Sequence, residues 1–146
     1  MREMESQIAT FEDASLILKL YELRRETVLR QARHWLIFQF NPVTTQEFMD
    51  LARGSASQEN AYFRQVLSYW EMAASLVLHG AVKADLFLSS NGEGMYILAK
   101  FDRYREEYQA QVGRPFMRQT SQLVEKYPVA HEIFNGMLKS IQTRPS

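Results

Sequence analysis

The segment between Ser57 and Gly80 constrains the fold more than any other part of the chain. Serine is a common first residue of helices, and glycine often ends them because it adopts the left-handed conformation at low cost. We therefore expect a helix that starts after Ser55 or Ser57 and runs to His79. Because apolar residues cover well over half of its circumference, this helix is expected at the centre of an all-α bundle. These residues are Tyr62, Phe63, Val66, Leu67, Tyr69, Trp70, Ala73, Ala74, Leu76 and Val77.

The rest of this helix is one narrow polar stripe, which begins at Asn60. The favoured interpretation is a solvated face. A second interpretation turns the stripe inward, where burial would raise the pKa of Glu71 and make it a candidate base. A third is a partner interface, because Arg, Trp and Tyr are common at binding hot spots. The candidate ligand or partner stripe consists of Arg64, Ser68, Glu71, Ser75 and His79.

Turn signals divide the N-terminal part into two further helices. The first is expected to begin near Thr10 and to continue to Asn41-Pro42, because proline disfavours helical geometry in the residue before it. It would be about 28 residues long, or roughly 42 Å. The second is bounded by the capping pattern at Thr44 and by Gly54, which is expected to be left-handed.

The C-terminal part gives shorter signals. Residues 82–88 suit one or two helical turns, and 89–92 a loop. An apolar stripe from Met95 to Tyr108 predicts one helix that ends before Gly113, and two more follow at 116–126 and 129–141. We find no alternation typical of strands. The chain is therefore predicted to be one all-α domain over residues 1–146, a bundle of four main and two or three short helices with no β-sheet. Residues 1–9 and 142–146 are expected to be flexible tails.

Composition removes several kinds of chemistry. The chain has no cysteine, which excludes disulfides, thiolate metal ligands and a cysteine nucleophile. Its three histidines have no carboxylate three or four positions earlier, so we expect no metal site. Gly92-Glu-Gly94 begins like a dinucleotide-binding motif, but Ile97 stands where the third glycine belongs. We expect no catalytic residue and no cofactor, and a non-enzymatic role is favoured.

Charge and hydropathy limit the partners. Seventeen basic and seventeen acidic side chains give zero net charge, which supplies no general attraction to nucleic acid. The turn at 51–58 resembles part of a helix-turn-helix. The helix that follows it, however, carries aromatic residues that are expected to lie in the core and not to contact DNA. The longest apolar run, Trp35–Phe38, is far shorter than the roughly 20 residues of a membrane span. The acidic N-terminal residues do not fit a signal peptide, so we expect a cytoplasmic protein with no membrane partner.

One stretch resembles a known kind of protein. The residues Asn60-Ala-Tyr-Phe, Leu67-Ser-Tyr-Trp-Glu71, His79-Gly80 and Asp85-Leu-Phe87 are similar to a segment of small bacterial helical proteins classed as domains of unknown function. The resemblance covers about residues 60–87. It implies an all-helical bacterial protein and brings no activity, cofactor or catalytic residue with it.

Three functional hypotheses follow from the sequence. The first is a protein-interaction or regulatory module that self-associates, possibly as a dimer, because of the long first helix and the many aromatic residues. The second is a ligand-binding or enzymatic bundle that uses the polar stripe of the central helix. The third is a weak nucleic-acid binder that uses the first helix and the 51–58 turn, and it is the least favoured.

Overall fold

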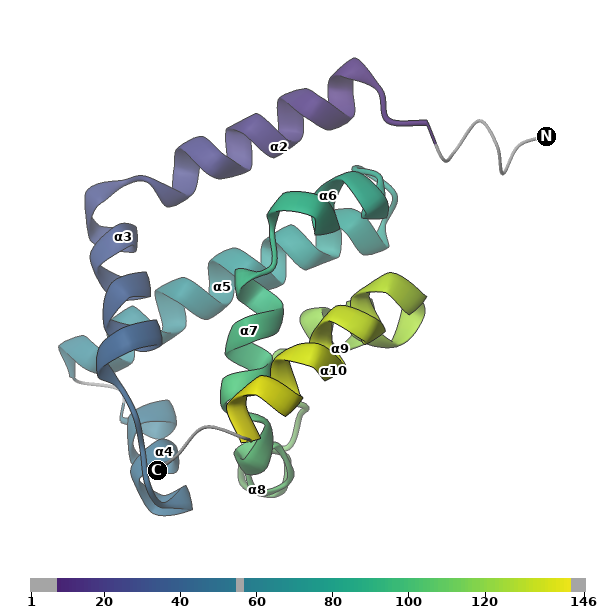
Figure 1. Cartoon of the computed structure of the whole chain (residues 1–146). Helices are drawn as coiled ribbons and strands as arrows, with labels where there is room; N and C mark the ends of the chain where they lie inside the picture. Colours follow the sequence, from purple (N-terminus) through teal and green to yellow (C-terminus); the bar gives the residue numbers. More distant parts are fainter. Residues whose placement is uncertain (1–7, 55–56, 143–146) are drawn as a thin grey trace.

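Helix α5 (Gln58–Leu78) is the central element, as predicted. The hydroxyl of Ser57 accepts a hydrogen bond from the amide of Asn60 at 2.9 Å, which caps the first turn. At the other end, Gly80 has a φ of 82°, the left-handed conformation that glycine favours. Seven of the ten apolar residues expected to pack are buried: Phe63, Val66, Tyr69, Trp70, Ala73, Ala74 and Val77. Figure 1 shows α5 crossing the middle of the molecule, with other helices on several sides.

The computed structural model describes residues 8–54 and 57–142, and within these ranges it contains helices and no strand. The all-α fold class is therefore confirmed. Of the predicted tails, residues 1–7 and 143–146 lie outside the described residues, while Gln142 is the last residue of a helix. Besides α5, the elements are α2 (Phe11–Arg24), α3 (Thr27–His34), the π-helix η1 (Trp35–Gln39), α4 (Thr45–Arg53), α6 (Ala84–Ser90), α7 (Glu93–Lys100), the 3-10 turn η2 (Asp102–Tyr104), α8 (Arg105–Val112), α9 (Arg118–Lys126) and α10 (Pro128–Gln142).

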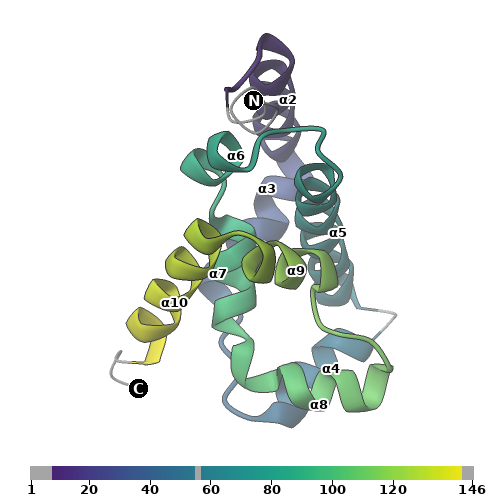
Figure 2. The same cartoon turned by 90° about the vertical axis from the view of Figure 1, so that its right-hand side faces the viewer.

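Some of the other helices pack directly on α5, and the rest lie farther out. Helices α3, α4, α7 and α9 pack directly against it, and α10 lies outside α7 and α9. Helix α2 runs along one edge, next to α6, whereas α4 and α8 lie at the opposite end (Figures 1 and 2). The N-terminal helix thus lies at the margin of the molecule.

An aromatic cluster around Phe48 joins the α4 end of the molecule to α5. The Phe48 ring lies 4.9 Å from the ring of Tyr104 and 5.1 Å from that of Phe101, centroid to centroid. The rings of Phe63 of α5 and of Phe116 lie nearly perpendicular to that of Phe48, at centroid distances of 6.0 and 5.6 Å. Such offset and edge-on pairs add about 0.5–1.5 kcal/mol each beyond the burial of their area. The cluster therefore connects four segments that are distant in sequence.

The prediction of one long N-terminal helix is wrong, because the helix is broken twice. Helix α2 ends at Arg24, and Glu26 adopts an extended ψ of 141°. The carboxylate of Glu26 then accepts the amide of Leu29 at 2.9 Å and so caps a new helix, α3. A π-helical turn follows, closed by the amide of Phe40 on the carbonyl of Trp35 at 2.9 Å. Glutamate is not among the preferred N-cap residues, so the break has no strong sequence signal.

The predicted helix from Met95 to Tyr108 is also interrupted. Helix α7 ends at Lys100, and the tighter 3-10 turn η2 brings both Phe101 and Tyr104 into the aromatic cluster. The hydroxyl of Tyr104 donates to the carbonyl of Pro42 at 3.0 Å, which fixes the turn. The helix is therefore interrupted here because the 3-10 turn lets both rings, Phe101 and Tyr104, pack in the cluster.

Three smaller boundary predictions need correction. Ser89 and Ser90 belong to α6 and not to a loop. Helix α9 begins at Arg118 rather than at residue 116, because Met117 is left-handed, with a φ of 48°. Gly54 has a φ of −81° and is not left-handed. A side chain there would place its Cβ 2.7 Å from the carbonyl oxygen of Asp50, so steric space, and not backbone handedness, requires this glycine.

Two helical glycines give a test of this packing. A Cβ on Gly94 of α7 would lie 3.1–3.3 Å from the side chain of Trp70, whereas one on Gly136 of α10 would meet nothing within 4 Å. We expect Gly94→Ala to lower the free energy of unfolding by about 1–3 kcal/mol. Gly136→Ala is expected to raise it by about 0.5–1 kcal/mol, because alanine loses less entropy in a helix. Urea denaturation of both variants checks this, and equal effects would contradict the close packing of α7 on α5.

Candidate interaction surface

Helix α2 has apolar residues on two opposite faces. Leu16, Ile17 and Leu20 face the molecule, and Leu20 is only 1% exposed. On the other face, Phe11, Leu18 and Tyr21 are 83%, 67% and 48% exposed. Since they occur at positions i, i+7 and i+10, they line one side of the helix. We call these three residues the outer face of α2; Figure 1 shows α2 at the edge of the molecule.

Asp13 anchors the N-terminal end of α2. Its carboxylate accepts the amide of Thr10 at 2.7 Å, and the hydroxyl of Thr10 accepts the amide of Asp13 at 3.1 Å, which completes a capping box. The other carboxylate oxygen accepts the amide of Lys83, just before α6, at 3.1 Å. The Thr10 amide lowers the pKa of Asp13, and Lys83 adds to this effect. A single carboxylate thus caps α2 and ties it to α6.

The C-terminal end of α2 is anchored by side chains of α5 and of the α6–α7 loop. The hydroxyl of Tyr69 donates to the carbonyl of Leu20, and burial raises the pKa of this tyrosine. The guanidinium of Arg24 donates to the side chain of Asn91 at 3.0 Å. It also lies over the ring of Trp70, 5.7 Å from the centroid, a favourable cation–π distance. Helix α2 is therefore fixed at both ends.

Arg33 and Glu93 form a two-point ion pair beneath this region. The guanidinium donates to both carboxylate oxygens, with Nε–Oε2 at 2.7 Å and Nη2–Oε1 at 2.8 Å. The indole of Trp70 donates to Oε2 at 2.9 Å, and Arg33 also donates to the carbonyl of Arg24 at 3.1 Å. The hydrogen bond to Glu93 raises the pKa of Arg33. We call Arg24, Arg33, Trp70, Asn91 and Glu93 the clamp, because they join the α2–α3 turn to α5 and α7.

The clamp offers no evident catalytic chemistry. It holds no serine, cysteine or histidine, and its carboxylate is engaged by three donors. Within the described residues, no buried side-chain nitrogen or oxygen lacks a hydrogen-bond partner. Side chains whose hydrogen bonds are all made to one another stabilise the fold. Here they fix the α2–α3 turn, which sets the direction of α2.

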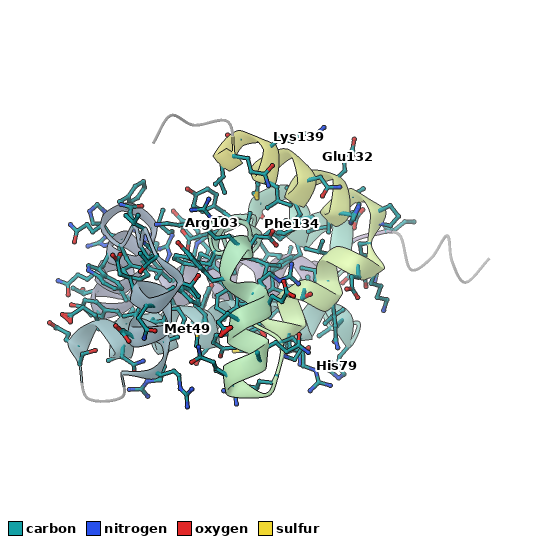
Figure 3. The ribbon with its side chains drawn as sticks, turned by 90° about the horizontal axis from the view of Figure 1, so that it is seen from below. Met49, His79, Arg103, Glu132, Phe134 and Lys139 are labelled. Atoms are coloured by element: carbon teal, nitrogen blue, oxygen red, sulfur yellow. The ribbon has the colours of Figure 1, made fainter. Side chains whose placement is uncertain are left out.

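The structure does not gather the predicted polar stripe of α5 around a cavity. Arg64 is exposed and donates to the side chain of Asn60 at 2.7 Å, and Ser68 is also exposed. The Ser75 hydroxyl donates to the carbonyl of Met72 at 2.7 Å, and His79 lies exposed at the end of the helix, where Figure 3 labels it. A ligand or partner role for the stripe stays a prediction.

Two members of the stripe cap neighbouring helices. The carboxylate of Glu71 accepts the amides of Gln119 and Thr120, at 2.8 and 2.9 Å, and the hydroxyl of Thr120 at 2.7 Å, all in the first turn of α9. The buried amide of Asn60 donates to the carbonyl of Leu51, in the last turn of α4, at 2.8 Å. Free amides and carbonyls at helix ends need such partners, so these polar side chains of a central helix have a structural use.

Other kinds of site find little support in the described part of the chain. No group of three His, Asp or Glu side chains there could hold a metal ion. No helix there is long and apolar enough to cross a membrane. Residues 55–56 of the predicted 51–58 turn lie outside the described residues. In α5, which would be the recognition helix, Phe63, Tyr69 and Trp70 are buried in the core and not displayed.

The outer face of α2 was not identified as a site from the sequence. Tyr21 and Val28 recur at helical spacing with the packed residues Leu16 and Leu20, yet they are 48% and 46% exposed. Phe11 and Leu18 stand seven residues apart and form a second apolar stripe, on the face opposite Leu20. This seven-residue spacing could have indicated a second apolar face on the helix. A single sequence, however, does not show which of two apolar faces is buried.

Comparison with known proteins gives a family. A family model described as Domain of unknown function (DUF4760) matches residues 9–127. The matched range includes α2 and the whole clamp, and it ends just before α10. The resemblance to a helical domain of unknown function, noted for residues 60–87, is thus confirmed over a longer range. No match was found among curated proteins or among solved structures.

Removing the carboxylate of Glu93 tests the clamp. Glu93→Ala leaves Arg33 and the Trp70 indole without their acceptor in a partly buried site. We expect a loss of about 2–4 kcal/mol in the free energy of unfolding, as when one partner of a buried ion pair is deleted. Glu125→Ala, at an exposed position of α9, is the matched control and is expected to stay within about 0.5 kcal/mol of the wild type. Similar values for both variants, measured in urea, would show that the clamp contributes nothing.

The lowered pKa of Asp13 predicts a pH dependence. Because its pKa is lower in the folded than in the unfolded chain, its contribution is present above the unfolded value of about 4 and is lost as the pH falls through the folded value. Asp13→Asn should therefore weaken the decline of stability on acidification. Thermal unfolding of both proteins at a series of acidic pH values checks this. Parallel curves for the two would contradict it.

Proposed function

The chain belongs to the DUF4760 family of domains of unknown function, and we propose that it is a protein-interaction module that self-associates through the outer face of α2. The observation that carries the proposal is the exposure of Phe11, Leu18 and Tyr21, which reaches 83% on one side of a single helix. Aromatic and large aliphatic side chains grouped in this way are typical of a surface that is covered in a complex.

The charges at the ends of α2 favour a second copy as the partner. The first turn carries the exposed acid Glu12, and the exposed base Arg25 follows the last turn, whereas Asp13 and Arg24 are engaged within the fold. If two copies of α2 pair antiparallel, the acidic end of each lies beside the basic end of the other. The two helix dipoles are then antiparallel, which is a favourable electrostatic arrangement. Such a contact uses the same face on both copies, which is the commonest symmetry of homodimers.

The anchoring of α2 supports the same proposal. Asp13 fixes one end of the helix to α6, and the clamp fixes the other end to α5 and α7. Because the helix is held in place before a partner arrives, little conformational entropy is lost on association. The outer face is thus presented on a rigid support.

A ligand-binding or enzymatic role for the polar stripe has less support. Glu71 would serve as its base, but it is occupied by three donors from α9. The nucleic-acid hypothesis has the least support, since the net charge is zero and α5 is a central core helix.

Replacement of Leu18 by glutamate tests self-association. The wild-type protein is expected to be a dimer at micromolar concentration by native mass spectrometry and by analytical ultracentrifugation. Leu18→Glu places two like charges in the centre of the antiparallel contact, so the dissociation constant should rise by at least about tenfold, or 1.4 kcal/mol. The variant should keep its stability, because the position is 67% exposed.

Val129→Glu is the matched control, because Val129 is 55% exposed on α10 and lies away from the outer face of α2. It should leave the dimer intact. A wild-type protein that stays monomeric across micromolar concentrations would overturn the proposal. A dimer that is unaffected by Leu18→Glu would place the interface elsewhere and would equally exclude the outer face of α2.

A further inference from the structure

A groove of about 980 Å³ lies away from α2, between the π-helix, α7 and α10. Its walls carry Ile37 and Phe38 of the π-helix, Tyr96 of α7, and Leu138 and Ile141 of α10. The proposed self-association uses none of these residues. The volume lies within the range of sites for small molecules, about 300–1,000 Å³.

The groove exposes apolar side chains from several elements. Phe38 is 68% exposed, and Ile37, Tyr96, Leu138 and Ile141 are each partly exposed. They belong to three elements that are distant in sequence, so only the fold brings them to one place. A ligand with an apolar body would remove this surface from water.

The π-helix fixes one wall of the groove. A π-turn does not form the regular helical hydrogen bonds, and here the ammonium of Lys100 donates to the carbonyls of Leu36 and Ile37, each at 2.9 Å. This contact holds the backbone that carries Ile37 and Phe38. Single π-turns occur often at functional sites, because they redirect side chains that a regular helix would place elsewhere.

Arg103 supplies the charge. It lines the groove and is exposed, and within the described residues its guanidinium makes no hydrogen bond or ion pair. The neighbouring acid, Asp102, is engaged by Arg105 at 3.1 Å. In Figure 3, Arg103 lies between the yellow ribbon of α10 and the blue-grey ribbons of the first third of the chain. The groove therefore combines apolar walls with Lys100 and Asp102, which are engaged, and with Arg103, which has no hydrogen-bond or ion-pair partner among the described residues.

We propose that this groove binds a small amphiphilic anion, with its carboxylate or phosphate head on Arg103 and its apolar body between the π-helix and α10. A guanidinium pairs with either head group through two parallel hydrogen bonds. The body contacts Phe38 on one wall and Leu138 and Ile141 on the other. Such a ligand would engage the Arg103 guanidinium, which has no partner in the part of the chain that the structure describes.

Titrations with three ten-carbon probes test the proposal: decanoate, decyl phosphate and the neutral 1-decanol. Each is added below the concentration at which it self-associates, and binding is followed by amide chemical shifts and by calorimetry. At least one of the two anions is expected to bind at least tenfold more tightly than decanol and to shift the amides of residues 37–38, 96–103 and 138–141. The tighter of the two anions identifies the head group.

Arg103→Gln is expected to weaken binding of that anion by about tenfold and to leave decanol binding unchanged. Arg114→Gln, an exposed arginine outside the groove, is the matched control and should bind as the wild type does. Leu138→Glu should abolish binding, and its folding is checked by circular dichroism. Because Arg103 is exposed, its variant tests the proposal even if Leu138→Glu does not fold.

Several outcomes would overturn the inference. They are the absence of binding by both anions, equal affinity for anion and alcohol, an Arg103→Gln variant that binds normally, and shifts confined to α2. Leu18→Glu is expected to keep full affinity for the anion. Failure of self-association and failure of ligand binding are therefore separate results.

Discussion

The carboxylate of Glu93 holds the N-terminal third of the chain against the rest. It receives two hydrogen bonds from Arg33 of α3 and one from Trp70 of α5, in a site where both charged side chains are about four-fifths buried, at 21% and 19% exposure. Charge-assisted bonds of this kind are short and directional. Because Arg33 also donates to the carbonyl of Arg24, the same contact fixes the α2–α3 turn. The direction of α2, and with it the exposure of its outer face, depends on this carboxylate.

Polar side chains of α5 have a second role in joining helices. Asn60 satisfies a carbonyl at the end of α4, and Glu71 satisfies two amides at the start of α9. A bundle of short helices has many free ends, and each end buried without a partner costs stability. Capping from a central helix solves this problem while the apolar residues of the same helix form the core. A polar stripe on a core helix can therefore reflect assembly and not chemistry.

Both proposed binding surfaces lie next to interruptions in helices. The turn at Arg25 and Glu26 separates α2 from α3, so α2 lies at the edge of the molecule with one apolar face exposed. The π-turn at residues 35–39 carries Ile37 and Phe38, which line the groove. A continuous helix from Thr10 to Asn41 would have placed these side chains differently. Each break is stabilised by a charged side chain, Glu26 in the first case and Lys100 in the second.

The sequence by itself determined the all-α class, the extent of α5 and the absence of cysteine chemistry, because these follow from local periodicity, capping residues and composition. It also singled out Glu71 as a candidate base, although not as a cap for α9. Only the tertiary structure decided where the first helix breaks, since Glu26 and Lys100 act there through partners that sequence periodicity does not reveal. The tertiary structure also decided which apolar face of α2 is buried. Local spacing is the same for a face that packs and for one that stays exposed, and only the position of Tyr69, Asn91 and Glu93 distinguishes them.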